Sequence, residues 1–282
     1  MNNKKLKNII NYFRRKKIFQ KNGITSQLFV NSTNEEFLKT HDKEITALRC
    51  KISYNDYGGY CVPLSSFFRP AAQKILSNEV YEPQTIRYIT SNYNGGSIVH
   101  AGTYFGDFLP ALSKSVNNQG MVWAFEPNLE NYRCAKITIE INNLNNVVLT
   151  HAALGATSGN SKLIVSDKNG KSLGGSSKII RENSIGTEKV ENVEIVRIDN
   201  IVDSKEKVSI IHLDIEGFEK EALLGGMNTI KKWHPIIILE SLPEDQLIES
   251  DWFLKHIIGM GYKLSTKIYR NMIYSINKKK NF

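Results

Sequence analysis

The chain has 282 residues, of which 41% are hydrophobic and 10% are aromatic, enough to bury the core of one large domain or of one domain with an extension. Every apolar run is shorter than the roughly 18 residues that a membrane-spanning helix needs, and no apolar stretch follows the basic N-terminus as it would in a secretory signal. The cysteines, Cys50, Cys61 and Cys134, are scattered and odd in number, which argues against a disulfide framework or a zinc site and predicts a cytoplasmic protein.

The net charge of +9 is concentrated at the two ends of the chain. Residues 1–22 contribute +8 without a single acid, and the three lysines of residues 278–280 add +3, so the remainder sums to −2. The N-terminal segment also places apolar residues at helical spacing, namely Leu6, Ile9, Ile10 and Phe13. A basic amphipathic helix at 1–22 can lie peripherally on an anionic membrane surface, but a helix docked on the protein or a solvated tail fits the same pattern.

Residues 23–80 are expected to form an accessory or cap segment. The stretch "NDYGGYCVPL" at 55–64 has the turn chemistry of a loop or a hairpin. A helix is expected to begin at Pro70, because proline is best tolerated in the first turn.

From residue 81 on, apolar strands alternate with helical segments. Strands are expected at 97–102, 120–127, 146–154, 207–217 and 235–241, helices at 81–93, 105–116, 128–143, 218–232 and 244–261, and a closing hairpin at 262–268 and 271–276. This order predicts a doubly wound α/β domain over 81–282, with seven strands in a mostly parallel sheet, helices on both faces and an antiparallel hairpin at one edge. Residues 155–206 interrupt the alternation and are expected to form an inserted hairpin with a Gly/Ser loop, either covering an acceptor or lying on the surface.

The carboxyl ends of four expected strands meet at one edge of such a sheet, which is where doubly wound folds bind ligands. Candidate cofactor-binding residues there are His100, Ala101, Gly102, Thr103, Tyr104, Gly106, Glu126, Pro127, Asn128, Ala152 and Ala153. Gly102 allows a sharp turn and a close ligand approach, and Gly106 allows close packing of a helix. Glu126 ends the next strand, where an acid accepts hydrogen bonds from the hydroxyls of a ribose.

The glycine loop also indicates which cofactor to expect. A dinucleotide site needs G-x-G-x-x-G and a phosphate loop needs Gly-Lys-Ser/Thr, and neither motif is present. The bulky Thr103, Tyr104 and Phe105 between Gly102 and Gly106 favour a cofactor without a phosphate at that place, such as S-adenosylmethionine.

The stretch "HLDIEGFE" at 212–219 supplies the catalytic candidates. Asp214, His212 and Glu216 follow or end a strand, and Asp214 and Glu216 share a face if the strand persists. Such carboxylates act as a base, orient a hydroxyl or bind a divalent metal. A structural role fits as well: Glu216 capping the next helix, Asp214 pairing with a cation and His212 lying satisfied in the core. Glu219 is expected on the helix surface.

Two blocks of the chain, "AFEPNLENYRCAKITIEINNLNNVVLTHAALG" and "HLDIEGFEKEALLGGMNTIKKWHPIIILE", resemble the FkbM-type S-adenosylmethionine-dependent methyltransferases. The family pattern runs D-V-G-A-N-x-G, A-F-E-P, N-x-x-x-N, A-L-G, K-x-D-V-E-G-x-E and P-x-x-x-x-E, and the match covers roughly residues 95–276. The resemblance implies a Rossmann-like class I methyltransferase that methylates hydroxyls of sugars, glycans or other natural products. Two positions depart from the pattern: His100 replaces the acid of the first strand, and His212 replaces a lysine.

Other functions remain open on the sequence. The departure at His100 and the basic N-terminus also suit a membrane-associated binding or scaffold protein that keeps a degenerate form of the fold without activity. A nucleic-acid methyltransferase is disfavoured by the near-neutral body of the chain and by the absence of an Asn-Pro-Pro-aromatic motif.

Overall fold

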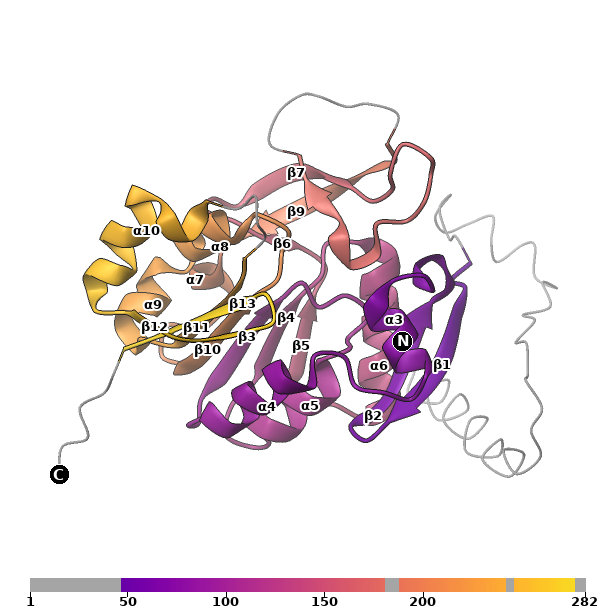
Figure 1. Cartoon of the computed structure of the whole chain (residues 1–282), viewed down its shortest axis with the longest axis horizontal. Helices are drawn as coiled ribbons and strands as arrows, with labels where there is room; N and C mark the ends of the chain where they lie inside the picture. The colour runs from indigo at the N-terminus through magenta and orange to yellow at the C-terminus, as the bar shows by residue number, and fades with distance from the viewer. Residues whose placement is uncertain (1–46, 181–187, 242–245, 277–282) are drawn as a thin grey trace, which may run out of the picture. The chain divides into compact units, whose positions relative to one another are not determined.

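The computed structural model describes residues 47–180, 188–241 and 246–276 (Figure 1). The chain divides into two units, Met1–Ala47 and Leu48–Phe282, and all the elements described below belong to the second. The basic segment at 1–22, residues 23–46 of the accessory segment and the lysines at 278–280 lie outside the described residues. No helix in the described ranges has both the length and the hydropathy to cross a membrane.

The second unit is built on a seven-stranded sheet, in the order β12-β13-β11-β10-β3-β4-β5. These strands are Lys263–Ile268, Asn271–Ser275, Ile236–Glu240, Val208–Leu213, Ser97–Ala101, Val122–Phe125 and Val147–Thr150. Strands β3, β4, β5, β10 and β11 are parallel, and β13 runs antiparallel to both β11 and β12. The central strands β3 and β10 are buried throughout, as expected of apolar runs covered on both faces.

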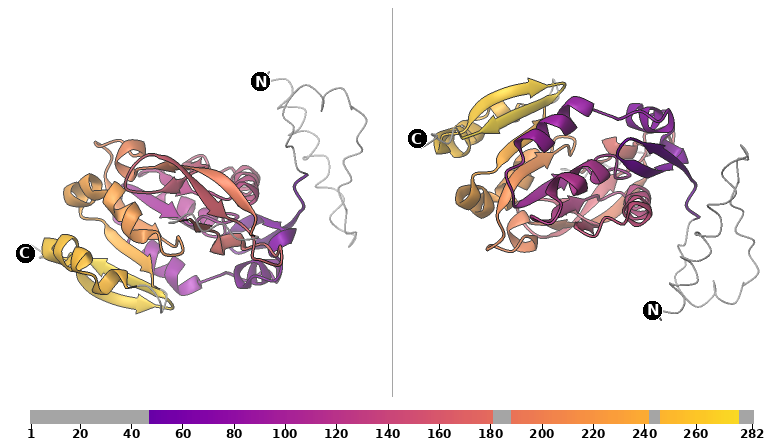
Figure 2. Two further views of the ribbon diagram at one scale, coloured as in Figure 1. Left: turned by 90° about the horizontal axis from the view of Figure 1, so that it is seen from above. Right: turned by 90° about the horizontal axis from the view of Figure 1, so that it is seen from below.

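Helices cover the sheet on both faces, so the domain is doubly wound as the sequence predicts (Figure 2). On one face, α4 (Pro83–Asn92), α5 (Leu109–Val116) and α6 (Leu129–Asn142) pack on Ile98, Ile210 and Ile238. On the other face, the core of Val99, Ile211 and Ile237 lies under α7 (Ile198–Ile201), α8 (Glu219–Gly225), α9 (Met227–Trp233) and α10 (Asp251–His256).

Several element boundaries differ from the expectation. The helix expected at 105–116 begins at Leu109, because Tyr104 and Gly106 adopt positive φ angles before it. The helix expected at 218–232 divides into α8 and α9 where Gly225 packs so closely that a Cβ would stand 2.1 Å from the carbonyl oxygen of Gly155. The helix expected at 244–261 is broken into η3 (Leu247–Glu249), α10 and η4 (Ile258–Met260).

The interruption at 155–206 forms a sheet of its own. Strand β5 ends at Thr150, and β6 (Ala153–Leu154) leaves the main sheet to pair in parallel with β9 (Val190–Val196). The antiparallel β7 (Gly159–Ile164) and β8 (Lys178–Ile179) complete the order β6-β9-β7-β8. The strand expected at 146–154 is therefore two strands in two sheets.

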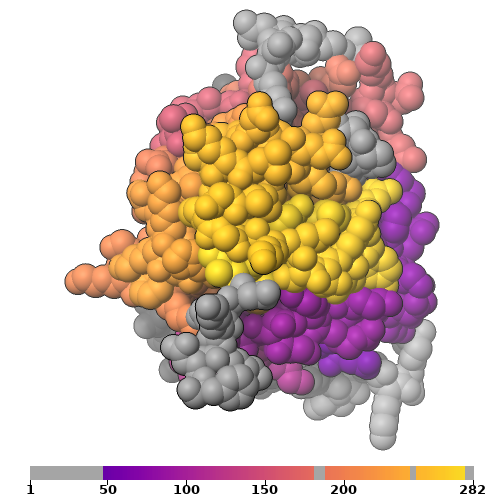
Figure 3. Space-filling model, turned by 60° about the vertical axis from the view of Figure 1, so that its left-hand side comes forward, coloured from indigo at the N-terminus to yellow at the C-terminus, as the bar shows by residue number. Residues whose placement is uncertain are grey.

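The described part of the accessory segment packs onto the first helical layer. It forms the hairpin β1 (Cys50–Asn55) and β2 (Gly58–Pro63), the short helix η1 (Leu64–Ser66) and the helix α3 (Pro70–Leu76), which begins at the expected proline. Strand β2 is tied to α6 by the Cys61 N–H, which donates to Thr138 Oγ1 at 3.0 Å. In Figure 3 the yellow surface of the C-terminal hairpin borders the purple surface of an earlier part of the chain. The hairpin is joined to the start of α4 by Asn271, whose Nδ2 donates to Glu82 Oε2 at 2.8 Å.

The three cysteines, distant in sequence, gather where the β1–β2 hairpin packs on α6: Cys50 is in β1, Cys61 in β2 and Cys134 in α6. Cys61 and Cys134 are fully buried and Cys50 is partly buried beside them, all as free thiols. Contact with Cys61 and then burial raise the pKa of Cys50, and contact with Cys134 raises the pKa of Cys61. Because the thiolate is the reactive form, the raised pKa values of Cys50 and Cys61 make these two thiols structural rather than nucleophilic.

Candidate active site

The site lies at the carboxyl edge of the sheet, where the chain leaves β3 and β10 toward opposite faces. After β3 it passes to α5 on one face, and after β10 it passes to α8 on the other. The two strand ends stay bound to each other, since the Asp214 N–H donates to the Ala101 carbonyl at 3.1 Å. Divergence of two adjacent parallel strands opens the crevice in which doubly wound folds bind ligands.

A cleft of about 440 Å³ opens at this edge. Six of the expected cofactor residues line it, together with the expected catalytic Asp214: Ala101, Gly102, Glu126, Pro127, Ala152 and Ala153. The other expected residues lie near the edge without lining the cleft, namely His100, Thr103, Tyr104, Gly106, Asn128, His212 and Glu216. The remaining lining residues are Phe125, Leu154, Leu163, Gly175, Ser177, Ile179, Ile215 and Phe218.

The two glycines of the loop are held by neighbouring backbone and by a helix. Gly102 has φ +83°, and a Cβ there would stand 1.8 Å from the carbonyl oxygen of Asp214. Gly106 has φ +86°, and a Cβ there would press on Leu109 and Thr138 at 3.2 Å. Both positions therefore require glycine because their φ angles are positive. Position 102 also requires it because the chain that follows β10 approaches its backbone so closely.

Glu126 is the most strongly bound acid of the cleft. Its Oε2 accepts from the Tyr104 N–H at 2.7 Å, and its Oε1 accepts from the Asn128 N–H at 2.9 Å and from Asn131 Nδ2 at 3.4 Å. Burial raises the pKa of Glu126 to about 8, although these three donors oppose the shift. The carboxylate is thus fixed in orientation at the cleft wall, with lone pairs left for further donors.

His100 and His212 form a buried pair beneath the edge. They are register partners on β3 and β10, their Nδ1 atoms are 3.1 Å apart, and their rings stack on each other at 5.0 Å. Phe108 packs on both rings, at 5.5 and 5.4 Å. Burial, and then the charge of His212, lowers the pKa of His100 well below its usual value, and burial lowers the pKa of His212 to about 4. Both rings are therefore neutral, one donating its Nδ1 proton to the other.

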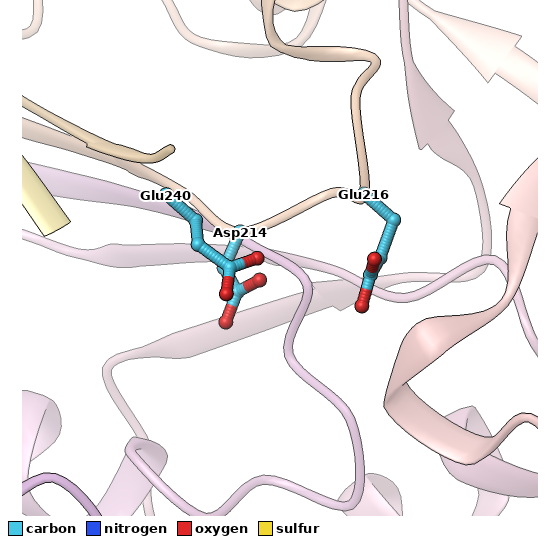
Figure 4. Close-up of side chains that lie close together, drawn as sticks. All are labelled: Asp214, Glu216 and Glu240. Atoms are coloured by element: carbon cyan, nitrogen blue, oxygen red, sulfur yellow. The ribbon is translucent and has the colours of Figure 1, made fainter. Parts of the chain in front are cut away.

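Three carboxylates converge beside the cleft, as Figure 4 shows. Asp214, Glu216 and Glu240 each offer an oxygen, and these atoms lie within 4.8 Å of one another. The cations next to them are distant and exposed: Lys178 lies 3.9 Å from Glu216 and Arg270 lies 3.8 Å from Glu240. Such ion pairs are weak, so they offset little of the repulsion among the three carboxyl groups.

Mutual repulsion and burial act on this cluster together. Burial, and then the charge of Glu240, raises the pKa of Asp214 well above its usual value. Burial, and then the charge of Glu240, also raises the pKa of Glu216, against the hydrogen bond of Ser176. Glu82, before α4, has a pKa raised by burial and adds its charge to the same region. Carboxyls in this state can take up a proton from a bound hydroxyl or share a cation.

The expectation that Asp214 and Glu216 share one face of a strand is wrong. Strand β10 ends at Leu213, and Glu216 lies in a turn at φ +54°, so Asp214 and Glu216 converge from a loop rather than along a strand. Glu219, expected on the helix surface, is 1% exposed, and its Oε1 accepts from the N–H groups of Ile215 and Gly217 at 3.1 and 3.3 Å. Glu219 therefore holds the turn that presents Glu216.

Two contributions to the site were not identified from the sequence. Glu240 ends β11, so it too lies at the edge where the carboxyl ends of the parallel strands meet, and the same expectation applies to it. The inserted sheet supplies Leu163, Gly175, Ser177 and Ile179 to the cleft wall, and no local pattern in the sequence marks these residues.

Comparison with known proteins places the chain in a family. A family model described as the methyltransferase FkbM domain matches residues 100–260, which is more than half of the chain. The chain belongs to the FkbM methyltransferase family. The match gives the chain a methyltransferase domain of this family, and its seven-stranded sheet has the expected class I architecture.

Among solved structures, the chain is similar to methyltransferase FkbM from Methylobacillus flagellatus KT, at 16% identity over 79% of this chain and 56% of that one, with a TM-score of 0.45. It is similar to a SAM-dependent methyltransferase from Aquifex aeolicus, at 14% identity over 73% and 91%, with a TM-score of 0.37. A third is tRNA (uracil-54, C5)-methyltransferase from Pyrococcus abyssi in complex with S-adenosyl-L-homocysteine, at 14% identity over 80% and 43%, with a TM-score of 0.40. The chain spans little more than half the length of the first of these proteins. Comparison with curated proteins finds no match.

Proposed function

We propose that this methyltransferase transfers the methyl group of S-adenosylmethionine to a hydroxyl of a sugar, a glycan or a similar small natural product. Asp214 carries the proposal, because this one residue both lines the cleft and belongs to the carboxylate cluster beside it. A cofactor in the cleft and a hydroxyl at the cluster would meet at Asp214.

The residues of the cleft fit the cofactor. The cleft lies where adjacent parallel strands diverge, which is the place where doubly wound folds bind nucleoside cofactors. Glu126 has its carboxylate fixed at the wall and suits the two hydroxyls of a ribose. Pro127, Ala152, Leu163 and Ile179 give an apolar surface for a flat base. When bound, S-adenosylmethionine supplies an electrophilic methyl group, so the chain needs mainly to align the acceptor.

Asp214 is the proposed group that receives the proton of the acceptor hydroxyl. The neighbouring carboxyls of Glu240 and Glu216 contribute, after burial, to the raised pKa of Asp214, which favours proton uptake as the hydroxyl oxygen attacks. The same three oxygens suit a divalent cation that would screen the hydroxyl instead, which is the alternative role of the cluster. His212, expected as a second base, makes its contact with His100 beneath the edge and is not assigned a proton-transfer step.

The carboxylate cluster also bears on the class of acceptor. Ionised carboxylates only accept hydrogen bonds, so they match a ligand rich in hydroxyl or ammonium donors. A phosphate at 4 Å from one such carboxylate is repelled by about 4 kcal/mol at an effective dielectric constant of about 20. This favours a neutral or cationic polyhydroxylated acceptor over a nucleic acid.

Calorimetry with S-adenosylhomocysteine, together with transfer of a labelled methyl group, tests the proposal. We expect binding, and transfer to a neutral or amino sugar in a panel that also contains uronic acids and tRNA. Asp214→Asn should abolish transfer and leave S-adenosylhomocysteine binding intact. Absence of binding and of any effect on melting would instead support a scaffold without activity, and label in tRNA with a steep salt dependence would support a nucleic-acid enzyme. Loss of transfer in EDTA, restored by Mg²⁺, would assign the metal role to the cluster.

For residues 1–22 we propose peripheral contact with an anionic membrane, supported by the basic and apolar pattern of that segment. Deleting these residues should reduce binding to phosphatidylserine vesicles without changing the affinity for S-adenosylhomocysteine. Equal vesicle binding by the full-length and the shortened chains would refute this proposal.

A further inference from the structure

Asn131, in the first turn of α6, joins the candidate ribose acid to the inserted sheet. Its Nδ2 donates to Glu126 Oε1 at 3.4 Å and to the carbonyl oxygen of Gly174 at 3.1 Å. The side chain is 1% exposed, and its own N–H is capped by Asn128 Oδ1 at 3.1 Å. One amide group therefore holds two segments that the sequence separates by almost fifty residues.

The second segment, residues 174–177, is a turn that forms part of the cleft wall. Gly175 and Ser177 line the cleft, and Ser177 Oγ accepts from Asn128 Nδ2 at 3.2 Å and donates to the Gly174 carbonyl at 2.8 Å. The first turn of α6 thus holds both ends of this turn, through Asn131 at Gly174 and through Asn128 at Ser177.

Glycines let the 174–177 turn lie flat on Tyr104. A Cβ at Gly175 would stand 3.5 Å from ring carbons of Tyr104, and one at Gly174 would stand 3.0 Å from its hydroxyl. The N–H of the same Tyr104 donates to Glu126 at 2.7 Å. Glu126, Asn131, Gly174 and Tyr104 therefore form a closed ring of contacts around one corner of the cleft.

This ring is not fully satisfied. Within the described residues Asn131 Oδ1 is buried without a hydrogen-bond partner, and the Tyr104 hydroxyl and Ser66 Oγ lie next to each other beside Gly174. Buried polar atoms without partners destabilise the conformation that buries them, so the closed turn is only slightly more stable than an open one. A ligand that fixes Glu126 would also fix Asn131 and shift the equilibrium toward the closed turn.

We propose that Asn131 is a positioning residue that couples recognition of the ribose by Glu126 to closure of the 174–177 turn over the cofactor. The inference rests on the proposed cofactor site and goes beyond it by assigning the turn as its cover. Asn131 does not touch the reacting atoms; it acts through Glu126 and through Gly174.

Calorimetry with S-adenosylhomocysteine and with its 2′-deoxy analogue tests the coupling. The full-length chain should bind S-adenosylhomocysteine about tenfold or more tightly than the analogue, because a hydrogen bond to a charged group is lost. In Asn131→Ala this ratio should fall toward one. Asn142→Ala is the matched control: that asparagine bonds Gly59 from the far end of α6, so its loss should lower the melting temperature without changing the ratio.

Hydrogen exchange at residues 174–177 gives the second readout. S-adenosylhomocysteine should protect these amides in the full-length chain and in Asn142→Ala, and should fail to protect them in Asn131→Ala. An unchanged ratio together with unchanged protection in Asn131→Ala overturns the coupling and leaves the cofactor site standing. No binding of S-adenosylhomocysteine by the full-length chain overturns both.

Discussion

Glutamine in place of Glu126 makes the most direct test of how the cleft recognises its ligand. The side chain is 4% exposed, and burial raises the pKa of Glu126 from 4.5 to about 8. At about 1.4 kcal/mol for each pKa unit, the shift means that folding favours protonated over ionised Glu126 by about 5 kcal/mol. Because the folded pKa is the higher one, this stabilisation is complete below about pH 4.5 and is lost as the pH rises through about 8.

Glu126→Gln cannot titrate, so the part of the pH dependence that belongs to this residue should disappear. Urea unfolding of both proteins at pH 5 and pH 8.5 measures it: the stability of the native chain should fall more steeply with pH than that of the variant. The difference between the two slopes isolates Glu126 from the other buried acids. At high pH the variant gains stability because it buries no charge. Part of this gain is lost, because the new amide NH₂ group faces a backbone N–H that donates a hydrogen bond to the carboxylate in the native chain.

Binding should show the opposite trend, since the ionised carboxylate is the form that accepts two ribose hydroxyls. Affinity for S-adenosylhomocysteine should fall by up to about tenfold for each pH unit below about 8, as binding must first remove a proton. Glu126→Gln should bind about 10- to 100-fold more weakly at pH 8.5 and with little pH dependence. Equal pH dependence in the two proteins, for both unfolding and binding, would refute the assignment of Glu126 to the ribose.

Three further substitutions test the edge of the sheet. Gly102→Ala should lower the melting temperature far more than Gly170→Ala, because both positions have positive φ but only the first would place a Cβ 1.8 Å from a carbonyl oxygen; similar losses would mean that the close approach relaxes freely. Asp214→Asn should reduce kcat by about 100-fold or more at unchanged affinity for S-adenosylhomocysteine, and a change in affinity alone would contradict its role as base. His100→Asp should be destabilising alone, and the added substitution His212→Lys should restore part of the lost stability. Thermal unfolding of the single and double variants should give a coupling free energy of about 1 kcal/mol or more, and additive effects would show that the two positions do not interact.

The sequence predicted the main sheet well because its strands are buried on both faces. Strands β3 and β10 read as continuous apolar runs, and the polar residues that follow them mark the edge where parallel strands end together. Glu126 and Asp214 could be placed in one cleft on this reasoning alone. Glu240 ends β11 in the same way, so the sequence carries the signal for this residue too.

Other features had no local signal. Leu163 and Ile179 reach the cleft only because β6 leaves the main sheet for the inserted one, a choice made by long-range pairing with β9. The convergence of Glu216 on Asp214 depends on a turn at positive φ that Glu219 holds, and neither follows from an alternating pattern. The interruption between α8 and α9 at Gly225 likewise reflects a contact with Gly155, seventy residues earlier.

The two departures from the family pattern become one feature in three dimensions. His100 and His212 are 112 positions apart in sequence, yet they are register partners whose Nδ1 atoms are 3.1 Å apart. In the family pattern these positions hold an acid and a lysine, so a pair of opposite charges is replaced by two neutral rings that share a proton. The contact between the two rings links β3 to β10 next to the close approach of Gly102 and Asp214. A charged residue introduced at only one of these two buried positions would leave a charge without a partner.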